Sequence, residues 1–176
     1  MKEVVIPSSV KSIREGAFCK CNNLSTLTLS EGLESIGDHS FQSAALREVV
    51  IPGSVKRIEM YAFYNCKSLS KVTFQNGVEI IGESSFSGTA LREVVIPSSV
   101  KRLECCAFSG YYYNKNEDKE VHNTTLQKVI LNKGLESIGD SCFSYNDGLR
   151  EVVIPSSVKS IGVGAFCGCS NLSVIF

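Results

Sequence analysis

The stretch LREVVIPGSVKRIEMYAFYNC, residues 46–66, contains the pattern that decides the fold. Its first part alternates apolar and polar side chains, so Val49 and Ile51 are expected to point into a core. This period of two is typical of a strand with one buried face. Pro52 ends the strand, because proline has no backbone N–H to donate to a ladder. The residues that follow predict two further buried positions and a turn around Phe63 that is too short to be an independent helix.

The pattern recurs along the chain. Repeats begin at Met1, Leu24, Leu46, Leu69, Leu91, Leu126, Leu149 and Leu172. The steps between these starts are 23, 22, 23, 22, 35, 23 and 23 residues. Val5, Val50 and Val95 are spaced by 45 residues, so odd and even repeats form a duplicated pair. The sequence therefore predicts a single array of about seven and a half repeats over residues 1–176.

Stacking the repeats in parallel places equivalent side chains about 4.8 Å apart, so that they form columns. The largest column runs through seven repeats and consists of Phe18, Phe41, Phe63, Phe86, Phe108, Phe143 and Phe166. Burying one phenylalanine side chain is worth about 1.5–3 kcal/mol. One repeat cannot bury such a side chain alone, whereas a stack forms a continuous core. The predicted fold class is therefore a repeat solenoid.

The pattern L-x-x-V-x-[IL]-P-x-S-V-x-x-I-x-x-x-A-F-x-x-C, which residues 46–66 reproduce, resembles the BspA-like leucine-rich repeat, also called the Treponema pallidum type. The match covers nearly the whole chain outside residues 111–122. The resemblance implies a β-rich, right-handed, curved array, with a parallel sheet on its concave side and short turns or single helical turns on the other side. Known members are mostly surface or secreted proteins of bacteria and parasitic protists, and several are implicated in adhesion.

Composition argues against several classes of function. The chain has 18 basic and 18 acidic residues, so no basic field attracts phosphates and nucleic acid is not an expected partner. No apolar run approaches the roughly 20 residues needed to cross a bilayer, and no signal peptide is visible. Two histidines, with no nucleophile placed beside a base, predict that the chain is not an enzyme. No cofactor is expected.

Eight cysteines raise the question of disulfides and metal sites. The cysteines that follow a column phenylalanine by three residues are Cys21, Cys66 and Cys169. Cys21 and Cys66 lie two repeats apart, about 10 Å, which is too far for a disulfide. We interpret them as small buried hydrophobic residues, and we expect no metal site. The pairing that the geometry leaves open joins Cys105 or Cys106 to Cys142, although free thiols are preferred.

The outward face of the strands predicts a flat, mixed-charge sheet that can bind an extended partner over many repeats. The candidate partner-binding residues on this face are Arg47, Glu48, Val50, Lys71, Arg92, Glu93, Val95, Lys128 and Arg150. The alternative is a solvated face whose charges pair across strands, at about 0.2–1 kcal/mol per pair. The sequence leaves both interpretations open.

The long step contains an insertion, YYYNKNEDKEVH, at residues 111–122. Tyr111, Tyr112 and Tyr113 are further candidate partner-binding residues, because tyrosine buries much area at little entropic cost and insertions in solenoids often bind partners. The alternative is a tolerated loop whose tyrosines pack against the neighbouring repeats.

These observations favour a protein–protein interaction or adhesion module of a cell-surface or secreted protein. By the family resemblance, its partner would be a protein of a host matrix or of a cell surface. The alternatives are a structural spacer and an intracellular scaffold with no dedicated ligand site. Neither end has a recognisable polar cap, which predicts a segment of a longer array that associates end to end with itself.

Overall fold

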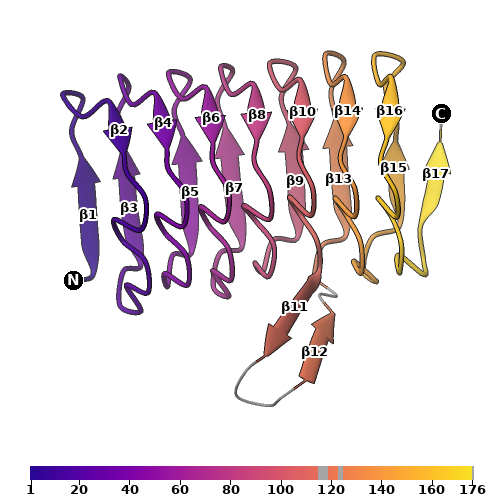
Figure 1. The fold of residues 1–176 in the computed structure, drawn as a ribbon, viewed down its shortest axis with the longest axis horizontal. Coiled ribbons are helices and arrows are strands. Elements are labelled where there is room, and N and C mark those ends of the chain that lie inside the picture. The colour runs from indigo at the N-terminus through magenta and orange to yellow at the C-terminus, as the bar shows by residue number, and fades with distance from the viewer. Residues whose placement is uncertain (115–118, 123–124, 176) are drawn as a thin grey trace.

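The protein forms a parallel β-solenoid, in which the coils lie side by side (Figure 1). The computed structural model describes residues 1–114, 119–122 and 125–175, with side chains described outside residues 112–124 and 174–176. The longer strands are β1 (Glu3–Ile6), β3 (Thr26–Leu29), β5 (Glu48–Ile51), β7 (Lys71–Phe74), β9 (Glu93–Ile96), β13 (Lys128–Leu131), β15 (Glu151–Val153) and β17 (Ser173–Ile175). The short strands are β2 (Ser12–Ile13), β4 (Ser35–Ile36), β6 (Arg57–Ile58), β8 (Ile80–Ile81), β10 (Arg102–Leu103), β14 (Ser137–Ile138) and β16 (Ser160–Ile161).

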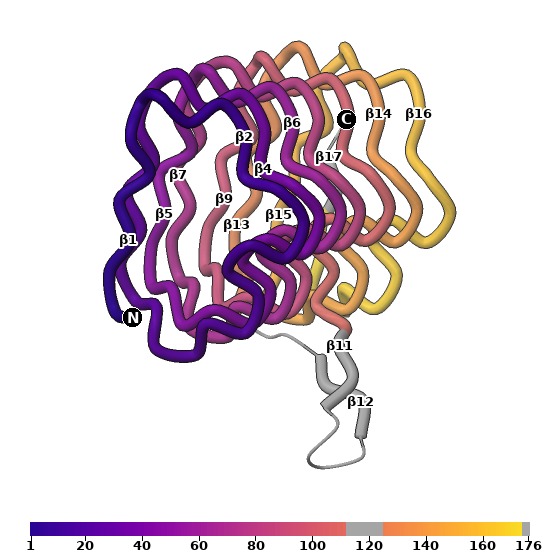
Figure 2. Tube along the Cα trace, turned by 60° about the vertical axis from the view of Figure 1, so that its left-hand side comes forward, coloured from indigo at the N-terminus to yellow at the C-terminus, as the bar shows by residue number. Residues whose placement is uncertain are grey.

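The longer strands have the predicted alternation. In β5, Val49 and Ile51 are 2% and 0% exposed, whereas Val50 between them is 50% exposed. The parallel register is also as predicted, because Val49 lies opposite Val72 of β7. The longer strands line one side of the solenoid and the short strands line another (Figure 2).

The short strands form one continuous seven-stranded sheet in the order β16-β14-β10-β8-β6-β4-β2. Equivalent apolar residues lie opposite each other in this sheet, as Ile36 and Ile58 do. Ile58 is fully buried, so this column contributes to the core. The short sheet therefore fixes the register of all the coils that it joins.

The longer strands are divided into three hydrogen-bonded groups, β1-β3, β5-β7 and β9-β13-β15-β17. No ladder joins β3 to β5 or β7 to β9. These two seams coincide with the two 22-residue steps in the sequence, from Leu24 to Leu46 and from Leu69 to Leu91. The chain has one residue fewer before the strand at these steps, and the long sheet is interrupted there.

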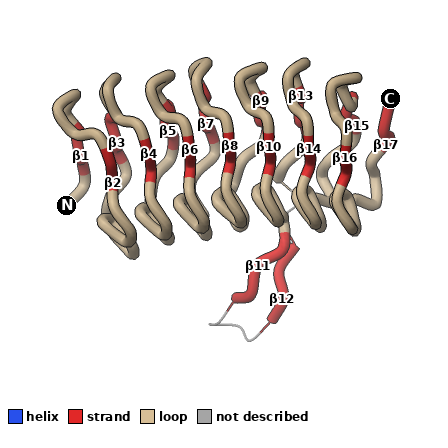
Figure 3. Tube along the Cα trace, turned by 45° about the horizontal axis from the view of Figure 1, so that its top comes forward, coloured by secondary structure: helices blue, strands red, loops and turns tan. Residues whose placement is uncertain are grey.

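The third side of each coil is a run of turns, which is the first of the two alternatives that the resemblance implied, and the described residues form no helical turn there (Figure 3). Backbone N–H groups in these turns donate along the solenoid axis to the next coil; Phe41 N donates to the Ala62 carbonyl oxygen at 2.8 Å. Residues two before and two after each column phenylalanine, except Gly110, adopt positive φ, which aims these groups at the neighbouring coil. The residues other than glycine that do so are Lys20, His39, Ser43, Tyr61, Asn65, Ser84, Cys106, Ser141 and Tyr145.

The predicted phenylalanine column is confirmed. Its rings stack almost parallel from Phe18 to Phe166, with centroid distances of 5.2, 5.2, 5.1, 5.3, 5.6 and 5.5 Å along the chain. Phe41, Phe63 and Phe143 are fully buried. The column therefore runs inside the solenoid along its length and forms the centre of the core.

One stripe of alternating charge crosses the outside of the coils just before the short strands. Its members, in coil order, are Lys11, Glu34, Lys56, Glu79, Lys101, Glu136 and Lys159. Successive members are joined by backbone hydrogen bonds, such as Lys56 N to the Glu34 carbonyl oxygen at 2.9 Å. Lys159 Nζ lies 2.8 Å from Glu136 Oε2 and lowers the pKa of that carboxyl through a hydrogen bond and its charge. We call this set the charge stripe.

The insertion forms a β-hairpin rather than an irregular loop. Strands β11 (Tyr111–Asn114) and β12 (Lys119–His122) pair antiparallel, with Tyr111 opposite His122. Aromatic residues favour strands, which accounts for a hairpin that begins at three tyrosines. The hairpin projects away from the coils (Figure 1).

Candidate functional site

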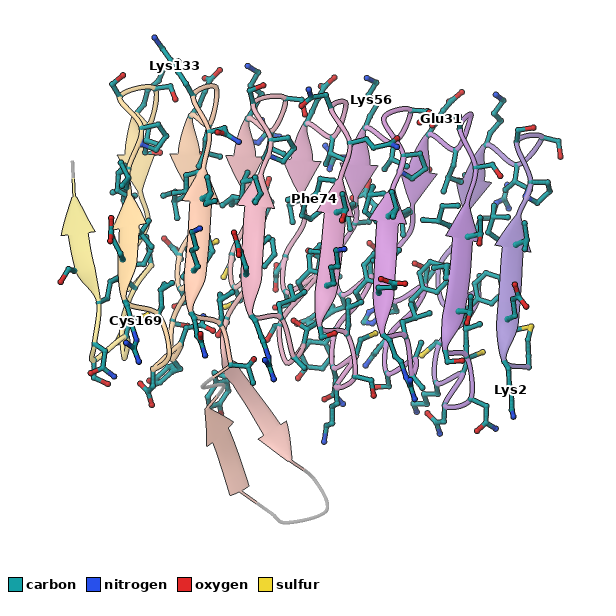
Figure 4. All side chains as sticks on the ribbon, turned by 180° about the vertical axis from the view of Figure 1, so that it is seen from behind. Lys2, Glu31, Lys56, Phe74, Lys133 and Cys169 are labelled. Atoms are coloured by element: carbon teal, nitrogen blue, oxygen red, sulfur yellow. The ribbon has the colours of Figure 1, made fainter. Side chains whose placement is uncertain are left out.

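All nine candidate residues on the sheet are exposed, and they come from β5, β7, β9 and β13 and from the positions just before the strands. They belong to three rows that run across the long strands. The first row, which we call the basic row, contains Lys2, Ser25, Arg47, Ser70, Arg92, Gln127 and Arg150. It follows one edge of the sheet, where Lys2 is labelled in Figure 4. The hairpin projects from this same edge.

The basic row is not neutralised by the protein itself. Within the described part of the chain, no carboxylate lies within 4.0 Å of the guanidinium groups of Arg47, Arg92 or Arg150. The residues between these arginines are serine or glutamine, which carry no charge. The row therefore presents hydrogen-bond donors and positive charge to solvent.

The second row contains Glu3, Thr26, Glu48, Lys71, Glu93, Lys128 and Glu151, and the third contains Val5, Thr28, Val50, Thr73, Val95, Ile130 and Val153. Both rows differ from the first. In the second row, Lys128 Nζ lies 3.4 Å from Glu93 Oε1, so part of its charge is paired across strands. The third row is apolar in the odd repeats, where the exposed fractions of Val5, Val50 and Val95 are 58%, 50% and 43%. The sheet thus combines a free basic edge, a partly paired middle row and an exposed apolar row.

A hollow of about 880 Å³ lies over the seam between β7 and β9, where the ladder is missing. It brings together four of the predicted candidates, Lys71, Arg92, Glu93 and Val95. Of its other polar lining residues, the strand alternation placed Ser70 and Thr73 on the outward face, whereas the sequence did not indicate Asn76, Ser98, Asn132 and Lys133. The 22-residue step was the available signal, because it marks the seam that the hollow covers.

A second hollow of about 550 Å³ lies over β13 and β15, a pair joined by a single bridge between Lys128 and Glu151. Lys128 and Arg150 line it, together with Gln127 of the basic row. The candidates Arg47, Glu48 and Val50 lie outside both hollows. The two hollows of the sheet face therefore lie over strands β7 to β15.

The hairpin is not brought onto the sheet face. The ring of Tyr111 lies 5.7 Å from the ring of Tyr145, and Ser87 Oγ donates to the Tyr111 carbonyl oxygen at 3.0 Å. Tyr111 thus contacts the turns of neighbouring coils, as the structural alternative anticipated. The side chains of Tyr112 and Tyr113 lie outside the described residues.

The cysteines are free thiols in the structure. Cys105 Sγ lies 3.5 Å from Cys106 Sγ, and the third member of the pairing left open by the sequence, Cys142, is fully buried. Burial and the Cys105 thiol raise the pKa of the Cys106 thiol to about 12, with smaller contributions from nearby carboxylates. Burial alone dominates at Cys66, whose thiol pKa is also raised to about 12.

The described residues supply no group of three or more histidine, cysteine, aspartate or glutamate side chains arranged to hold a metal ion. His39 is half-buried, with Nδ1 2.7 Å from Gln42 Oε1 and its ring stacked on Tyr61 at 4.9 Å. His122 has no described side chain. No helix of the described chain is long and apolar enough to cross a membrane.

Comparison with protein-family models identifies the repeat. The model for the BspA type leucine rich repeat region matches residues 1–115 and 117–176 in six copies. The chain belongs to the BspA-type leucine-rich repeat family. The parallel stacking and the phenylalanine column described above are therefore the features of a BspA-type solenoid in this chain.

Solved structures of other leucine-rich repeat proteins have the same fold. The T. pallidum leucine-rich repeat protein (TpLRR) aligns with a TM-score of 0.83 and 28% identity over 98% of this chain and 78% of that chain. The pneumococcal vaccine antigen PcpA aligns with a TM-score of 0.58 and 22% identity, and a Bacteroides ovatus leucine-rich repeat protein with 0.57 and 22%. Those alignments cover 99% and 98% of this chain, but only 62% and 60% of the PcpA and B. ovatus chains. A comparison with curated proteins finds no match.

Proposed function

We propose that this BspA-type solenoid is a non-enzymatic protein-binding module of a cell-surface or secreted protein, and that the long-strand sheet, as the concave side of a right-handed array, holds the partner. The observation that carries the proposal is the unneutralised basic row on a sheet face that also exposes a row of valines. Exposed charge that finds no partner within the protein favours encounter with a complementary surface. Apolar groups in the third row supply area that a partner can cover.

The family resemblance supports a partner from an extracellular matrix or from another cell's surface. The two hollows give such a partner concave sites on an otherwise flat sheet, and hollows are where protein surfaces concentrate binding energy. The hairpin projects from the edge of the sheet that carries the basic row, so its tyrosines stay candidate contacts for a partner at that edge.

The proposal is tested with a solubilised extracellular-matrix preparation immobilised on a biosensor surface. The variant Val50→Lys/Val95→Lys/Val153→Lys places three charges in the centre of the face, where the wild-type valines are 50%, 43% and 51% exposed. We expect its affinity to fall at least about tenfold, which corresponds to about 1.4 kcal/mol. The unfolding free energy should be nearly unchanged, since surface substitutions usually shift it by less than about 0.5 kcal/mol.

The matched control is Val163→Lys, because Val163 is 82% exposed and lies in the turns of its coil, outside the long strands. It should bind the matrix preparation as the wild type does. Equal binding by the triple variant would contradict the proposal. No binding by the wild type would favour the spacer.

A further inference from the structure

Two thiols lie side by side in the turns of coil five, the repeat that begins at Leu91. Cys105 Sγ lies 3.5 Å from Cys106 Sγ, and both side chains are partly exposed. Cys142, the other partner that the sequence left open, is fully buried. An oxidant from solvent therefore has access to Cys105 and Cys106 together, but not to Cys142. The pairing that the structure favours joins the two adjacent residues.

The carboxylates beside this pair oppose its ionisation but not its oxidation. The positions equivalent to Cys105 in the coils before and after it hold Glu83 and Asp140. Burial, followed by the Cys105 thiol and these two carboxylates, raises the pKa of the Cys106 thiol to about 12, so this thiol is protonated at neutral pH. A disulfide carries no charge, so the same carboxylates do not disfavour it.

The peptide group between the two cysteines makes one hydrogen bond to each neighbouring coil. Its carbonyl oxygen, on Cys105, accepts from Ser84 N of coil four at 2.9 Å. Its N–H, on Cys106, donates to the Asp140 carbonyl oxygen of coil six at 2.9 Å. A change in the orientation of this single peptide group therefore acts on the contacts of coil five with both of its neighbours.

A disulfide between adjacent residues strains this peptide group. Consecutive Cα atoms lie about 3.8 Å apart across a trans peptide, whereas disulfides usually join Cα atoms about 4.4–6.8 Å apart. Strained and exposed disulfides are reduced more readily than structural ones. The ring also encloses no length of chain, so it brings little of the entropic stabilisation that longer disulfide loops give. Such a bond is expected to be labile and to weaken the fold around it.

We propose that Cys105 and Cys106 form a redox-sensitive site, which closes reversibly to a vicinal disulfide and thereby loosens coil five from its neighbours. The oxidant is a low-molecular-weight disulfide of the glutathione class. Cys105 attacks first, because the Cys106 thiol is held protonated. Its thiolate forms a mixed disulfide, and the glutathione thiolate that leaves takes up the proton that Cys105 lost.

Cys106 then completes the reaction. Its sulfur attacks the Cys105 sulfur of the mixed disulfide and loses its proton to the second glutathione thiolate as that group leaves. The protein thus gives up two electrons and two protons, and one glutathione disulfide becomes two glutathione thiols. The inference is independent of the proposed function, because its test measures thiols and hydrogen exchange and does not involve the binding partner.

The bond is tested by treating the reduced full chain with oxidised glutathione, followed by alkylation, tryptic digestion and mass spectrometry. Trypsin releases both cysteines in one peptide, residues 103–115. We expect this peptide to lose two hydrogens and to resist alkylation, and excess reduced glutathione should restore both thiols. The variant Cys106→Ser should instead keep glutathione on Cys105 as a mixed disulfide. Serine is the matched replacement, because Ser84 and Ser141 hold this position in the two neighbouring coils.

The loosening of coil five is tested by NMR hydrogen exchange at single amides. Oxidation should speed exchange at Ser84 N and Cys106 N by about tenfold, which corresponds to the loss of about 1.4 kcal/mol at each hydrogen bond. Equivalent amides one coil further away serve as internal controls. Tyr61 N donates to the Glu83 carbonyl oxygen at 2.8 Å and Ser141 N to the Val163 carbonyl oxygen at 2.9 Å. Their exchange should not change.

The matched control variant is Cys19→Ser/Cys167→Ser, which removes two other accessible thiols. It should keep both the vicinal bond and its effect on exchange. A bond from Cys105 or Cys106 to Cys142, two free thiols under the oxidant, or unchanged exchange after the bond has formed would each overturn the inference. If Cys106→Ser does not fold, Cys105→Ser, which should leave Cys106 unmodified, and the peptide map of the wild type decide the same question.

Discussion

At the scale of single residues, the position three after a column phenylalanine does more than fill space in several repeats. Cys66 Sγ donates to the Phe41 carbonyl oxygen of the preceding coil at 3.1 Å, and the Asn146 amide donates to the Phe108 carbonyl oxygen at 2.9 Å. The sequence interpretation of the cysteines as small hydrophobic residues accounts for the burial of Cys66 and misses the hydrogen bond. A signal was present, because threonine and asparagine occupy the same position in other repeats and both can donate.

The buried thiols predict a dependence of stability on alkaline pH. Burial raises the pKa of the Cys66 thiol from 9.0 to about 12 in the folded protein. Its ionisation is therefore favoured by unfolding, so its contribution to stability is complete below pH 9.0 and is lost as the pH rises towards about 12. Each such thiol adds a slope of at most about 1.4 kcal/mol per pH unit in this window.

The measurement is urea denaturation from pH 7 to pH 11 of the wild type and of Cys66→Ala. Alanine is the matched replacement, because Ala44 occupies this position in the preceding repeat. We expect the variant to lose less stability above pH 9 than the wild type does. Identical slopes would show that the thiol is hydrated in the folded state.

At the scale of elements, the turns around the column phenylalanines have two positions with positive φ, and only some of these positions are glycine in the sequence. Glycine occupies such positions at Gly16, Gly88 and Gly168, but elsewhere they hold residues such as Lys20 and Tyr61. Because these positions hold many residue types and not glycine alone, the sequence does not reveal that the backbone there must adopt positive φ. The sequence therefore indicated turns, but not the hydrogen bonds between coils that these turns make.

This strain predicts a stabilising substitution. Lys20 is exposed and has φ 56°, a conformation that costs a non-glycine residue about 1–2 kcal/mol. Lys20→Gly should raise the unfolding free energy by about 0.5 kcal/mol, after the entropic cost of glycine is subtracted. The measurement is the midpoint of urea denaturation.

Gly168→Ala is the opposing control at the equivalent position of a later coil. Gly168 has φ 74°, and a Cβ atom there would lie 2.7 Å from Tyr145 Cδ1. Alanine should therefore lower the midpoint. A lower midpoint for Lys20→Gly as well would mean that the lysine side chain stabilises its turn through contacts that outweigh the backbone strain.

At the scale of the whole molecule, the stacking of the coils was predictable, because a parallel array of repeats places equivalent side chains of successive repeats next to each other. Val49 faces Val72 and Phe41 stacks on Phe63 for this reason. The two hollows were not predictable in the same way. They depend on where the long ladder is interrupted, and one residue more or less between strands determines this without changing the hydrophobic pattern. The hairpin was expected as a loop, because three adjacent tyrosines followed by a charged run do not alternate apolar and polar residues as a half-buried strand does.

The hairpin is predicted to be dispensable for the fold. The step that contains it is 35 residues, and deletion of residues 111–122 removes 12, which restores the 23-residue step of other repeats. We expect the shortened chain to unfold cooperatively with a free energy within about 1 kcal/mol of the wild type, because the loss includes one aromatic contact. Circular dichroism during urea denaturation measures this. A chain that no longer unfolds cooperatively would assign the hairpin a role in joining the coils on either side.

The charge stripe also constrains how such a protein lengthens over evolutionary time. If a single coil were excised, for example residues 69–90, Lys56 would come to lie beside Lys101 and Glu48 beside Glu93, so like charges would adjoin in two places. Excision or insertion of 45 residues keeps opposite signs adjacent. The repeating unit of the sequence is thus twice as long as the structural unit, and gain or loss of an even number of coils preserves the pairing of opposite charges.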